Sequence, residues 1–402
     1  MKLLLVNSVY GSGSTGRICA QLATAVKQAG DDCVVAYGRG KKEPIHGEKL
    51  YRVGPEIDVC LHGAATRLFD AHGLLSRRAT KKFISTIREY DPDIIHLHNI
   101  HGYYLNYEIL FDALRAIHKP VLWTLHDCWA FTGHCAYFDL ACCENWKSGC
   151  GNCPQRWTYP ASKIIDASSR NWRRKKKAFS GIEKLTIVTP SRWLAELSHK
   201  SFLGDYPTVV IPNGVDTSVF RRGVSEAMIR CSLPDGIEIG KYLLGVANEW
   251  EPRKGLKDFL KLAKRISDSD LKVLLVGLNE SQLKDLPPYV YGMKRTGSTE
   301  ALAALYSGCA AYLNLTYEEN YPTTNLEAAA CGADVITYAS GGCAETLHQN
   351  SIPVPKGDLD TVERLVRSLP LPLRCDAPCP ALDADKCFER YLELYQNVLS
   401  NT

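Results

Sequence analysis

Short apolar runs alternate with amphipathic stretches along most of the chain. The first run, residues 2–7, is followed by a segment, 17–28, whose apolar residues recur at helical spacing. Runs of the same kind predict buried strands at 2–7, 33–37, 94–98, 121–125, 185–188, 208–211, 242–246, 272–276, 310–315 and 334–337. This alternation predicts an α/β fold with parallel sheets covered by helices on both faces.

The alternation divides into two halves. A length of 402 residues also suits two domains of about 150–200 residues each. We predict one Rossmann-like domain over 1–190, a second over 191–380, and a C-terminal helical segment over 381–402. The Pro-rich stretch 370–380 is predicted to be a linker or an irregular loop.

Composition adds little to this picture. The chain is 45% hydrophobic and 23% charged, which is ordinary for a globular protein. No apolar run approaches the roughly 20 residues that cross a bilayer, and the apolar start before Asn7 is too short for a signal peptide. The sequence therefore predicts a cytoplasmic protein.

The formal charge of +4 is mild, but two segments concentrate basic residues. One is the run 170–177 and the other is 77–82, which Phe83 and Ile84 follow. They are either solvated helix faces or surfaces for anionic lipid or a diphosphate-bearing acceptor. Neither run carries a recognisable nucleic-acid module, so we expect no nucleic-acid partner.

The segment 319–332 is the most informative motif. Glu319 and Glu327 flank a Pro-Thr-Thr turn, and a small-residue helix follows that ends at Gly332. A helix N-terminus favours phosphate, and ionised carboxylates accept hydrogen bonds from sugar hydroxyls. The motif therefore suits a phosphorylated sugar, although two surface glutamates at a helix start are a plausible alternative.

Three other motifs follow predicted strands. Gly11–Gly16 fits G-x-G-x-x-G, but no carboxylate follows the second strand, so a dinucleotide site is disfavoured and close backbone approach to a phosphate or sugar is favoured. Arg253 and Lys254 suit a diphosphate. His126 follows the strand 121–125, where open parallel sheets bind ligands, although it can equally be a structural histidine.

Five cysteines lie within nineteen residues, at Cys135, Cys142, Cys143, Cys150 and Cys153. The C-x-x-C pair with two earlier thiols suits a structural zinc ion, and Cys128 and His134 are spare candidates. Disulfides or free thiols are the alternatives. Without a secretion signal, a reducing compartment and therefore zinc are favoured.

Together these motifs resemble the retaining GT-B glycosyltransferases of family 4 over nearly the whole chain. The matching residues are Glu319–Glu327, Cys331-Gly332, Ser340–Gly342, Arg253–Gly255, Pro212–Asp216 and His126-Asp127. The cysteine cluster resembles an exopolysaccharide and colanic-acid-type subgroup, in which the matching cysteines are Cys135, Cys143, Cys150 and Cys153. The resemblance implies two Rossmann-like domains facing a central cleft, with the C-terminal helix crossing back to the first domain.

The resemblance also implies roles for single residues. Glu319 would bind the donor sugar and Glu327 the nucleotide ribose, while Arg253 and Lys254 would stabilise the leaving diphosphate without a catalytic metal. Backbone amides of Asn325 and Leu326 would contact the phosphate. On the other side, Gly13 and Ser14 would lie beside the phosphate and acceptor, and His126 beside the sugar. Asn248 stands where many members carry an arginine on the diphosphate, so Arg253 and Lys254 must supply that charge.

The implied function is transfer of a sugar, with retention, from a nucleotide sugar to a lipid-linked or oligosaccharide acceptor in bacterial surface polysaccharide synthesis. The leaving phosphate would deprotonate the acceptor, since no dedicated nucleophile is present. A nucleotide-sugar epimerase or a sugar phosphorylase on the same fold is the alternative. A non-catalytic binding protein is disfavoured by the retained Glu319, Glu327, Arg253 and Lys254.

Overall fold

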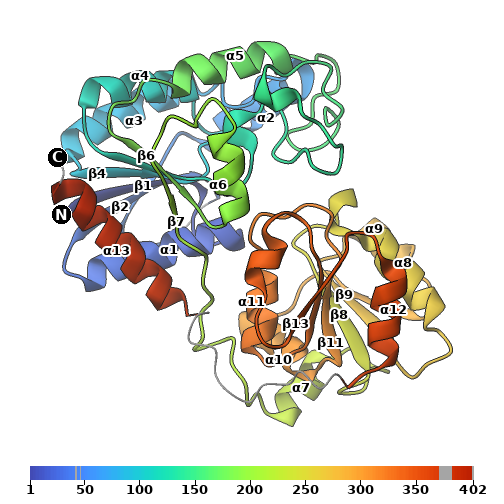
Figure 1. The fold of residues 1–402 in the computed structure, drawn as a ribbon. Coiled ribbons are helices and arrows are strands. Elements are labelled where there is room, and N and C mark those ends of the chain that lie inside the picture. The colour runs from blue at the N-terminus through green and yellow to red at the C-terminus, as the bar shows by residue number, and fades with distance from the viewer. Residues whose placement is uncertain (41–42, 46, 371–382, 401–402) are drawn as a thin grey trace. The chain divides into compact units, whose positions relative to one another are not determined.

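The computed structural model describes residues 1–40, 43–45, 47–370 and 383–400, which form two compact units. Unit 1 comprises Met1–Pro212 and Cys387–Thr402, and unit 2 comprises Asn213–Lys386. Each unit is a parallel sheet with helices on both faces (Figure 1). The predicted linker 370–380 lies almost wholly outside the described residues.

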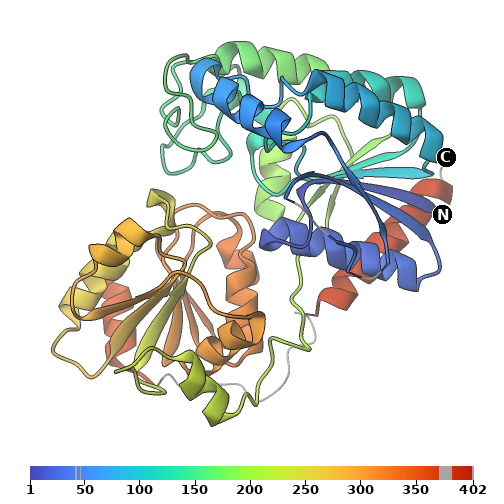
Figure 2. The ribbon, with the colours of Figure 1, turned by 180° about the vertical axis from the view of Figure 1, so that it is seen from behind.

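Unit 1 contains a seven-stranded sheet in the order β3-β2-β1-β4-β5-β6-β7. Its strands are β1 (Lys2–Val9), β2 (Asp32–Arg39), β3 (Lys49–Arg52), β4 (Ile94–Leu97), β5 (Val121–Thr124), β6 (Leu185–Thr189) and β7 (Thr208–Val210). Its helices are α1 (Gly13–Gln28), α2 (Glu56–Phe69), α3 (Arg77–Tyr90), α4 (Tyr107–Ile117), α5 (Ser168–Phe179) and α6 (Arg192–His199), with short 3-10 turns at Trp129–Phe131 and Asn145–Lys147. Helices α3, α4 and α5 cover one face, while α1 and the C-terminal helix cover the other (Figures 1 and 2).

Unit 2 contains a six-stranded sheet in the order β10-β9-β8-β11-β12-β13. Its strands are β8 (Tyr242–Val246), β9 (Lys272–Val276), β10 (Val290–Met293), β11 (Ala311–Asn314), β12 (Val335–Tyr338) and β13 (Ser351–Val354). Its helices are α7 (Glu226–Ser232), α8 (Leu256–Arg265), α9 (Glu280–Lys284), α10 (Thr299–Gly308), α11 (Thr323–Ala330) and α12 (Leu359–Arg367), with 3-10 turns η3 (Pro252–Lys254) and η4 (Gly341–Thr346). Helices α8 and α12 pack on one face of this sheet, and α10 and α11 on the other.

Three strands were not predicted, and all three lie at sheet edges. They are β3, β10 and β13, whose side chains are mostly half-buried. The central strand β1 shows the opposite pattern, because Leu3–Val6 are all buried between two layers of helices. A strand covered on both faces produces a continuous apolar run that reveals it in a sequence. The fourth edge strand, β7, is also half-buried, but it was predicted from the short apolar run at 208–211.

The predicted first boundary at residue 190 falls between β6 and α6, inside unit 1. The sheet of unit 1 continues through β7, which pairs with β6, and the unit ends at Pro212. The reason is that α6 leads into β7, which adds the last strand to the sheet of unit 1 before the chain passes into unit 2.

The C-terminal helix α13 (Ala384–Ser400) packs on unit 1 from Cys387 onward, as predicted. The hydroxyl of Tyr395 lies 2.7 Å from Nδ1 of His96, and that of Tyr391 lies 3.3 Å from Oγ1 of Thr124. These bonds join the end of the chain to β4 and β5. No helix in the described part of the chain is long and apolar enough to cross a bilayer.

Candidate functional site

The strand order of each sheet marks one crevice where a ligand can bind. In unit 2, β8 pairs in parallel with β9 on one side and β11 on the other, so the strand order reverses between β8 and β11. In open parallel sheets, ligands bind beyond the carboxyl ends of the two strands at such a point. The turn η3 follows β8 and the pair Glu318-Glu319 follows β11, so both predicted charge motifs lie at this position.

A glycine brings the two motifs together. Gly255 has a φ of +76°, and a Cβ atom there would lie 2.0 Å from the carbonyl oxygen of Leu315. The close approach lets the carbonyl oxygen of Arg253 accept a 2.7 Å hydrogen bond from the N–H of Tyr317. The basic pair is therefore fixed against the residues that follow β11.

Arg253, Lys254 and Glu319 form one charged cluster. Lys254 makes an ion pair with Glu319, Nη1 of Arg253 lies 3.6 Å from Oε2 of Glu319, and Nε of Arg253 lies 2.9 Å from Oε2 of Glu251. Burial opposes the charge on Glu319, but Lys254 and Arg253 outweigh it and lower the pKa of Glu319 to about 2. The cluster therefore holds two cations beside an ionised carboxylate.

Helix α11 begins next to this cluster. The side chain of Asn325 is buried and bonds to three neighbours, at 2.7 Å from Asn314 and 2.9 Å from Thr346, with Thr337 more distant. Its backbone N–H donates to the carbonyl of Pro322 at 3.2 Å. Asn325 therefore anchors α11 between β11, β12 and η4, and the amide assigned to the phosphate already has an acceptor.

The next residues of α11 point inward. Leu326 is buried in the apolar core of unit 2, and Glu327 is 3% exposed with Oε2 at 3.2 Å from the hydroxyl of Tyr306. By contrast, Asn248 is exposed in the turn after β8. The structure thus gathers Arg253, Lys254 and Glu319 closely, with Glu327 on the adjoining helix.

The corresponding position in unit 1 lies between β1 and β4, which are neighbours in the sheet. Gly13, with a φ of +65°, and Ser14 begin α1 directly after β1, and both are exposed. A loop that exposes backbone at a helix start permits close approach of an anionic or sugar group.

His126 follows β5 at the same edge of the sheet and lies beside a second histidine. Its Nε2 is 3.1 Å from Nδ1 of His98, which follows β4, and the two rings are stacked with centroids 5.3 Å apart. Burial lowers the pKa of His126 to about 4 and that of His98 well below its usual range. Both rings are therefore neutral near pH 7 and act there as hydrogen-bonding groups.

The carboxylate next to His126 has a different partner. Oδ2 of Asp127 lies 3.1 Å from Nε2 of His101, whose Nδ1 lies 3.2 Å from the hydroxyl of Tyr159. Burial opposes the charge on Asp127, and His101 together with the N–H of Trp129 overcomes it, so its pKa is lowered. His101 and Tyr159 were not predicted from the sequence, although His98 and His101 are three residues apart after the same strand.

Comparison with family models decides the classification. The model described as Glycosyltransferase Family 4 matches residues 15–219, about half of the chain, and that described as Glycosyl transferases group 1 matches residues 240–369. The chain belongs to glycosyltransferase family 4. The first match covers most of unit 1 and ends at residue 219, just inside unit 2, and the second lies wholly within unit 2. Each unit of this family 4 chain is therefore matched largely by one family model.

Two relatives give this family 4 chain a context. It is 29% identical over 228 residues to the putative colanic acid biosynthesis glycosyl transferase WcaC of Escherichia coli. That match covers 54% of this chain and 55% of WcaC. It is 26% identical over 160 residues to an N,N'-diacetylbacillosaminyl-diphospho-undecaprenol alpha-1,3-N-acetylgalactosaminyltransferase of Campylobacter jejuni, covering 37% of this chain and 43% of that protein. The chain therefore spans about half, or less, of the length of these relatives.

Solved structures confirm that the fold is GT-B. Sucrose-phosphate synthase from Thermosynechococcus elongatus covers the whole of both chains with a TM-score of 0.70 at 16% identity. Anabaena HepE in complex with UDP covers 99% of this chain and 100% of its own, with a TM-score of 0.67 at 13% identity. At these identities the likeness concerns the fold alone.

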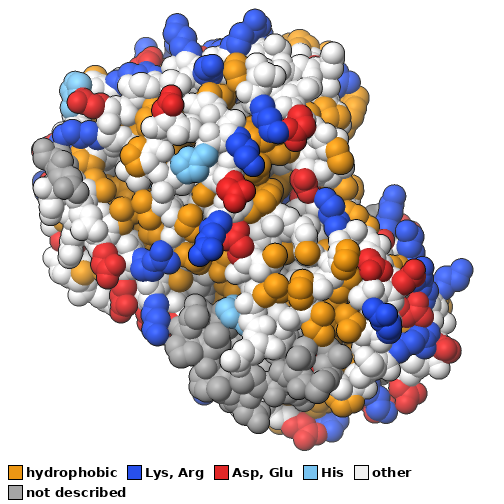
Figure 3. Space-filling view, viewed as in Figure 1, with side chains coloured by type: hydrophobic (Ala, Val, Ile, Leu, Met, Phe, Trp, Pro, Cys, Tyr) orange, Lys and Arg blue, Asp and Glu red, His pale blue; other side chains and the backbone are white. Residues whose placement is uncertain are grey.

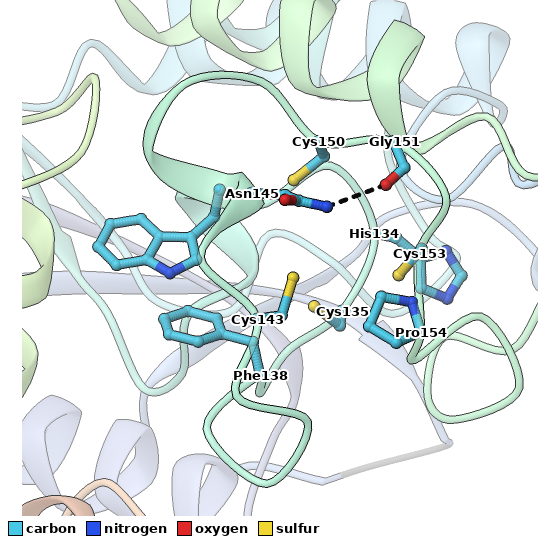
Figure 4. Close-up of a pocket in the computed structure, with 10 residues that line it drawn as sticks. His134, Cys135, Phe138, Cys143, Asn145, Cys150, Gly151, Cys153 and Pro154 are labelled. Atoms are coloured by element: carbon cyan, nitrogen blue, oxygen red, sulfur yellow. Dashed lines mark hydrogen bonds between the residues drawn. The ribbon is translucent and has the colours of Figure 1, made fainter.

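The cysteine cluster of this family 4 chain lies in the loops between β5 and α5. Cys135, Cys143, Cys150 and Cys153 line one small cavity together with His134, and Figure 4 shows their sulfur atoms grouped around it. The N–H of Gly133 donates to Sγ of Cys150 at 3.2 Å. A hydrogen bond with Cys135 lowers the pKa of Cys153 to about 7.

The surroundings of the cavity are charged and buried. Nδ1 of His134 lies 2.6 Å from Oδ1 of Asp70, and burial lowers the pKa of the nearby Lys175 to about 7. Within the described residues, no group of three or more His, Cys, Asp or Glu side chains meets the geometry of a metal site. In the same residues the cysteines are free thiols, and Cys142 is exposed and outside the cavity lining.

Proposed function

We propose that this chain transfers a sugar from a nucleotide sugar to a lipid-linked or oligosaccharide acceptor in bacterial surface polysaccharide synthesis, with retention at the anomeric carbon. The observation that carries the proposal is the cluster of Arg253, Lys254 and Glu319 at the strand-order reversal of unit 2. Two cations held by a carboxylate offer a diphosphate a charged site that needs no metal ion.

Donor binding would change the charge balance of this cluster. Arg253 and Lys254 now face Glu251 and Glu319, so two positive charges offset two negative ones. A diphosphate beside the cations would share them with these carboxylates and add hydrogen bonds from the N-terminus of α11. Asn248 would border the same diphosphate, Leu326 would help to shape the start of α11, and Glu327 would bind the nucleotide ribose.

The chemistry that this arrangement favours is a front-face displacement. The bond between the anomeric carbon and the leaving phosphate oxygen breaks as the acceptor oxygen bonds to the same face. The acceptor proton passes to the leaving phosphate oxygen. Arg253 and Lys254 would stabilise the negative charge that develops on the diphosphate, and Glu319 would orient both cations and a sugar hydroxyl.

Unit 1 would supply the acceptor side. Gly13 and Ser14 begin α1 with exposed backbone, and His126 is kept neutral by burial. A neutral imidazole can donate or accept one hydrogen bond with a sugar hydroxyl without competing for the acceptor proton. The two relatives are a putative colanic acid biosynthesis glycosyl transferase and a diphospho-undecaprenol N-acetylgalactosaminyltransferase, and this context favours a lipid-linked acceptor.

A panel of nucleotide sugars tests this proposal directly. We expect the full chain to release a nucleoside diphosphate from one donor and to glycosylate a component of bacterial membrane lipid extract, detected by mass spectrometry. Conversion of the donor to an epimer, or release of a sugar phosphate, would favour the alternative enzymes. If neither the donor nor the acceptor is consumed with any nucleotide sugar of the panel, that result would contradict an enzymatic role.

We also propose that the cavity among Cys135, Cys143, Cys150 and Cys153 holds a structural zinc ion. The cavity measures about 10 Å³, close to the room that a single water molecule needs. The four thiol side chains that line this space do not meet the geometry of a metal site in the described residues, so a bound zinc ion would have to draw their sulfur atoms to about 2.3 Å from itself. A site closed by four protein ligands would stabilise the loop and take no part in the reaction.

Elemental analysis measures the zinc content of the purified chain directly. We expect about one zinc ion per chain in protein purified without chelator, and loss of that ion with a lower melting temperature in Cys143→Ser and Cys150→Ser. Cys60→Ser is the matched control, because Cys60 is exposed on α2 and lies outside the cavity. Metal-free protein with four reactive thiols, or with two disulfides, would overturn the assignment.

A further inference from the structure

Helix α2 carries an apolar stripe on its outward face. Ile57 is 61% exposed, Leu61 59% and Leu68 41%, and with Ala64 they recur at the spacing of one helix face. The buried face of the same helix is less apolar, since it consists of Val59, His62, Gly63 and Thr66. An amphipathic helix in a globular protein normally turns its more apolar stripe inward, so this face calls for a partner.

A second exposed apolar segment lies beside the end of α2. Trp157 is 63% exposed, Ile164 64% and Ile165 40%. The N–H of Lys163 donates to the carbonyl of Arg67 at 2.7 Å, so this loop is joined to the last turn of α2. Figure 2 shows α2 alongside these loops. We call the outward face of α2, Phe69 and residues 156–165 the α2 surface.

A buried carboxylate fixes the α2 surface in place. Asp70, directly after α2, accepts a 2.9 Å hydrogen bond from the N–H of Ala167, and its carbonyl accepts one of 2.6 Å from the side chain of Asn171. Nδ1 of His134 lies 2.6 Å from the same carboxylate. The apolar side chains therefore project from a fixed base.

Basic side chains border this apolar area. Arg67, Lys163 and Arg170 are exposed, and the guanidinium of Arg156 lies 4.4 Å from the ring centroid of Trp157. Further along α5, Lys and Arg side chains gather on the surface (Figure 3). The acids on α2 are Glu56, which is paired with Arg52, and Asp58, which is half-buried. The rim is therefore positive around an apolar centre.

We propose that the α2 surface docks on an anionic lipid bilayer. Tryptophan and aliphatic side chains enter the boundary between head groups and acyl chains, while the surrounding basic residues attract anionic head groups. A second copy of this chain fits less well, because a symmetric contact would bring the same positive rim against itself. The proposal places the lipid contact mainly at α2 and residues 156–165.

The α2 surface also connects with the candidate site of unit 1. Tyr159, in the same loop, bonds to His101, which pairs with Asp127 next to His126. This step rests on the proposed function: docking of the α2 surface would bring a lipid-linked acceptor close to His98, His101 and His126. The lipid contact itself requires no donor and no turnover.

Vesicle sedimentation with the full chain tests the proposal. We expect binding to vesicles containing phosphatidylglycerol that weakens with salt, and much weaker binding to phosphatidylcholine alone. Leu61→Ser with Ile164→Ser should weaken binding at least about tenfold. Arg156→Gln and Lys163→Gln should each weaken binding to anionic vesicles by about fivefold.

Met228→Ser is the matched control, because Met228 is 41% exposed but lies on α7 in unit 2. Release of nucleoside diphosphate from a soluble donor should be unchanged in the Leu61→Ser, Ile164→Ser variant, which separates loss of docking from failure of the proposed activity. Unchanged vesicle binding in that folded variant would overturn the proposal. A lipid-free dimer that the same substitutions abolish would overturn it too, in favour of a second copy.

Discussion

Lys254→Ala is expected to lower turnover by about 100- to 1000-fold while the fold is retained. The ammonium group of Lys254 pairs with Glu319 and stands with Arg253 at the strand-order reversal of unit 2. In the proposed reaction, removing one of these two cations would remove stabilisation from the charge that develops on the leaving diphosphate. The loss corresponds to about 2.7–4 kcal/mol of barrier and is measured as kcat for nucleoside diphosphate release.

Lys261→Ala is the control for that measurement. Its side chain is 66% exposed on α8 of the same unit, 3.6 Å from Asp258, so the substitution removes one lysine charge without touching the cluster. We expect turnover to stay within about twofold of the parent chain, because the ammonium group is mostly exposed and the buried Asp258 keeps hydrogen bonds from the hydroxyls of Tyr317 and Tyr338. Near-normal turnover in Lys254→Ala would remove that residue from its proposed role.

Gly255→Ala is expected to destabilise unit 2 by about 2–5 kcal/mol. Two effects add: an L-residue at a φ of +76° is strained, and its Cβ would lie 2.0 Å from the carbonyl oxygen of Leu315. Relief requires η3 to move away from β11, which also displaces Arg253 and Lys254. Calorimetry should therefore show a lower melting temperature, and activity should fall with it.

Gly240→Ala separates the two effects. Gly240 has the same φ of +76°, but nothing lies within 4 Å of the Cβ position. This control should show the backbone strain alone, about 1–2 kcal/mol, with the charged cluster undisturbed. Equal destabilisation in both variants would mean that the contact with Leu315 is absorbed without cost.

The central strands of both sheets could be predicted because burial on two faces gives them continuous apolar runs. The edge strands β3, β10 and β13 could not, because their half-exposed segments carry no continuous apolar run, whereas the edge strand β7 does. The end of unit 1 could not be predicted, because it depends on β7 pairing with β6, and local sequence does not show which sheet a strand joins.

The candidate site shows the same division. Arg253, Lys254 and Glu319 were predicted because each motif follows an apolar strand. The ion pair between Lys254 and Glu319 joins residues 65 positions apart, so it depends on the folded chain. Likewise, His126 was predicted, but its partner His98 and the separate pair of Asp127 with His101 depend on which strands are neighbours.

The contact of Tyr395 with His96 has a consequence for the far end of the polypeptide. His96 lies in β4, its ring centroid is 4.3 Å from that of His98, and His98 in turn stacks on His126. The seventeen-residue helix α13 thus packs behind His96 and, through it, supports His98 and His126. A substitution on the inner face of α13 would therefore change the interior of unit 1 and the position of the ring that we propose for the acceptor side.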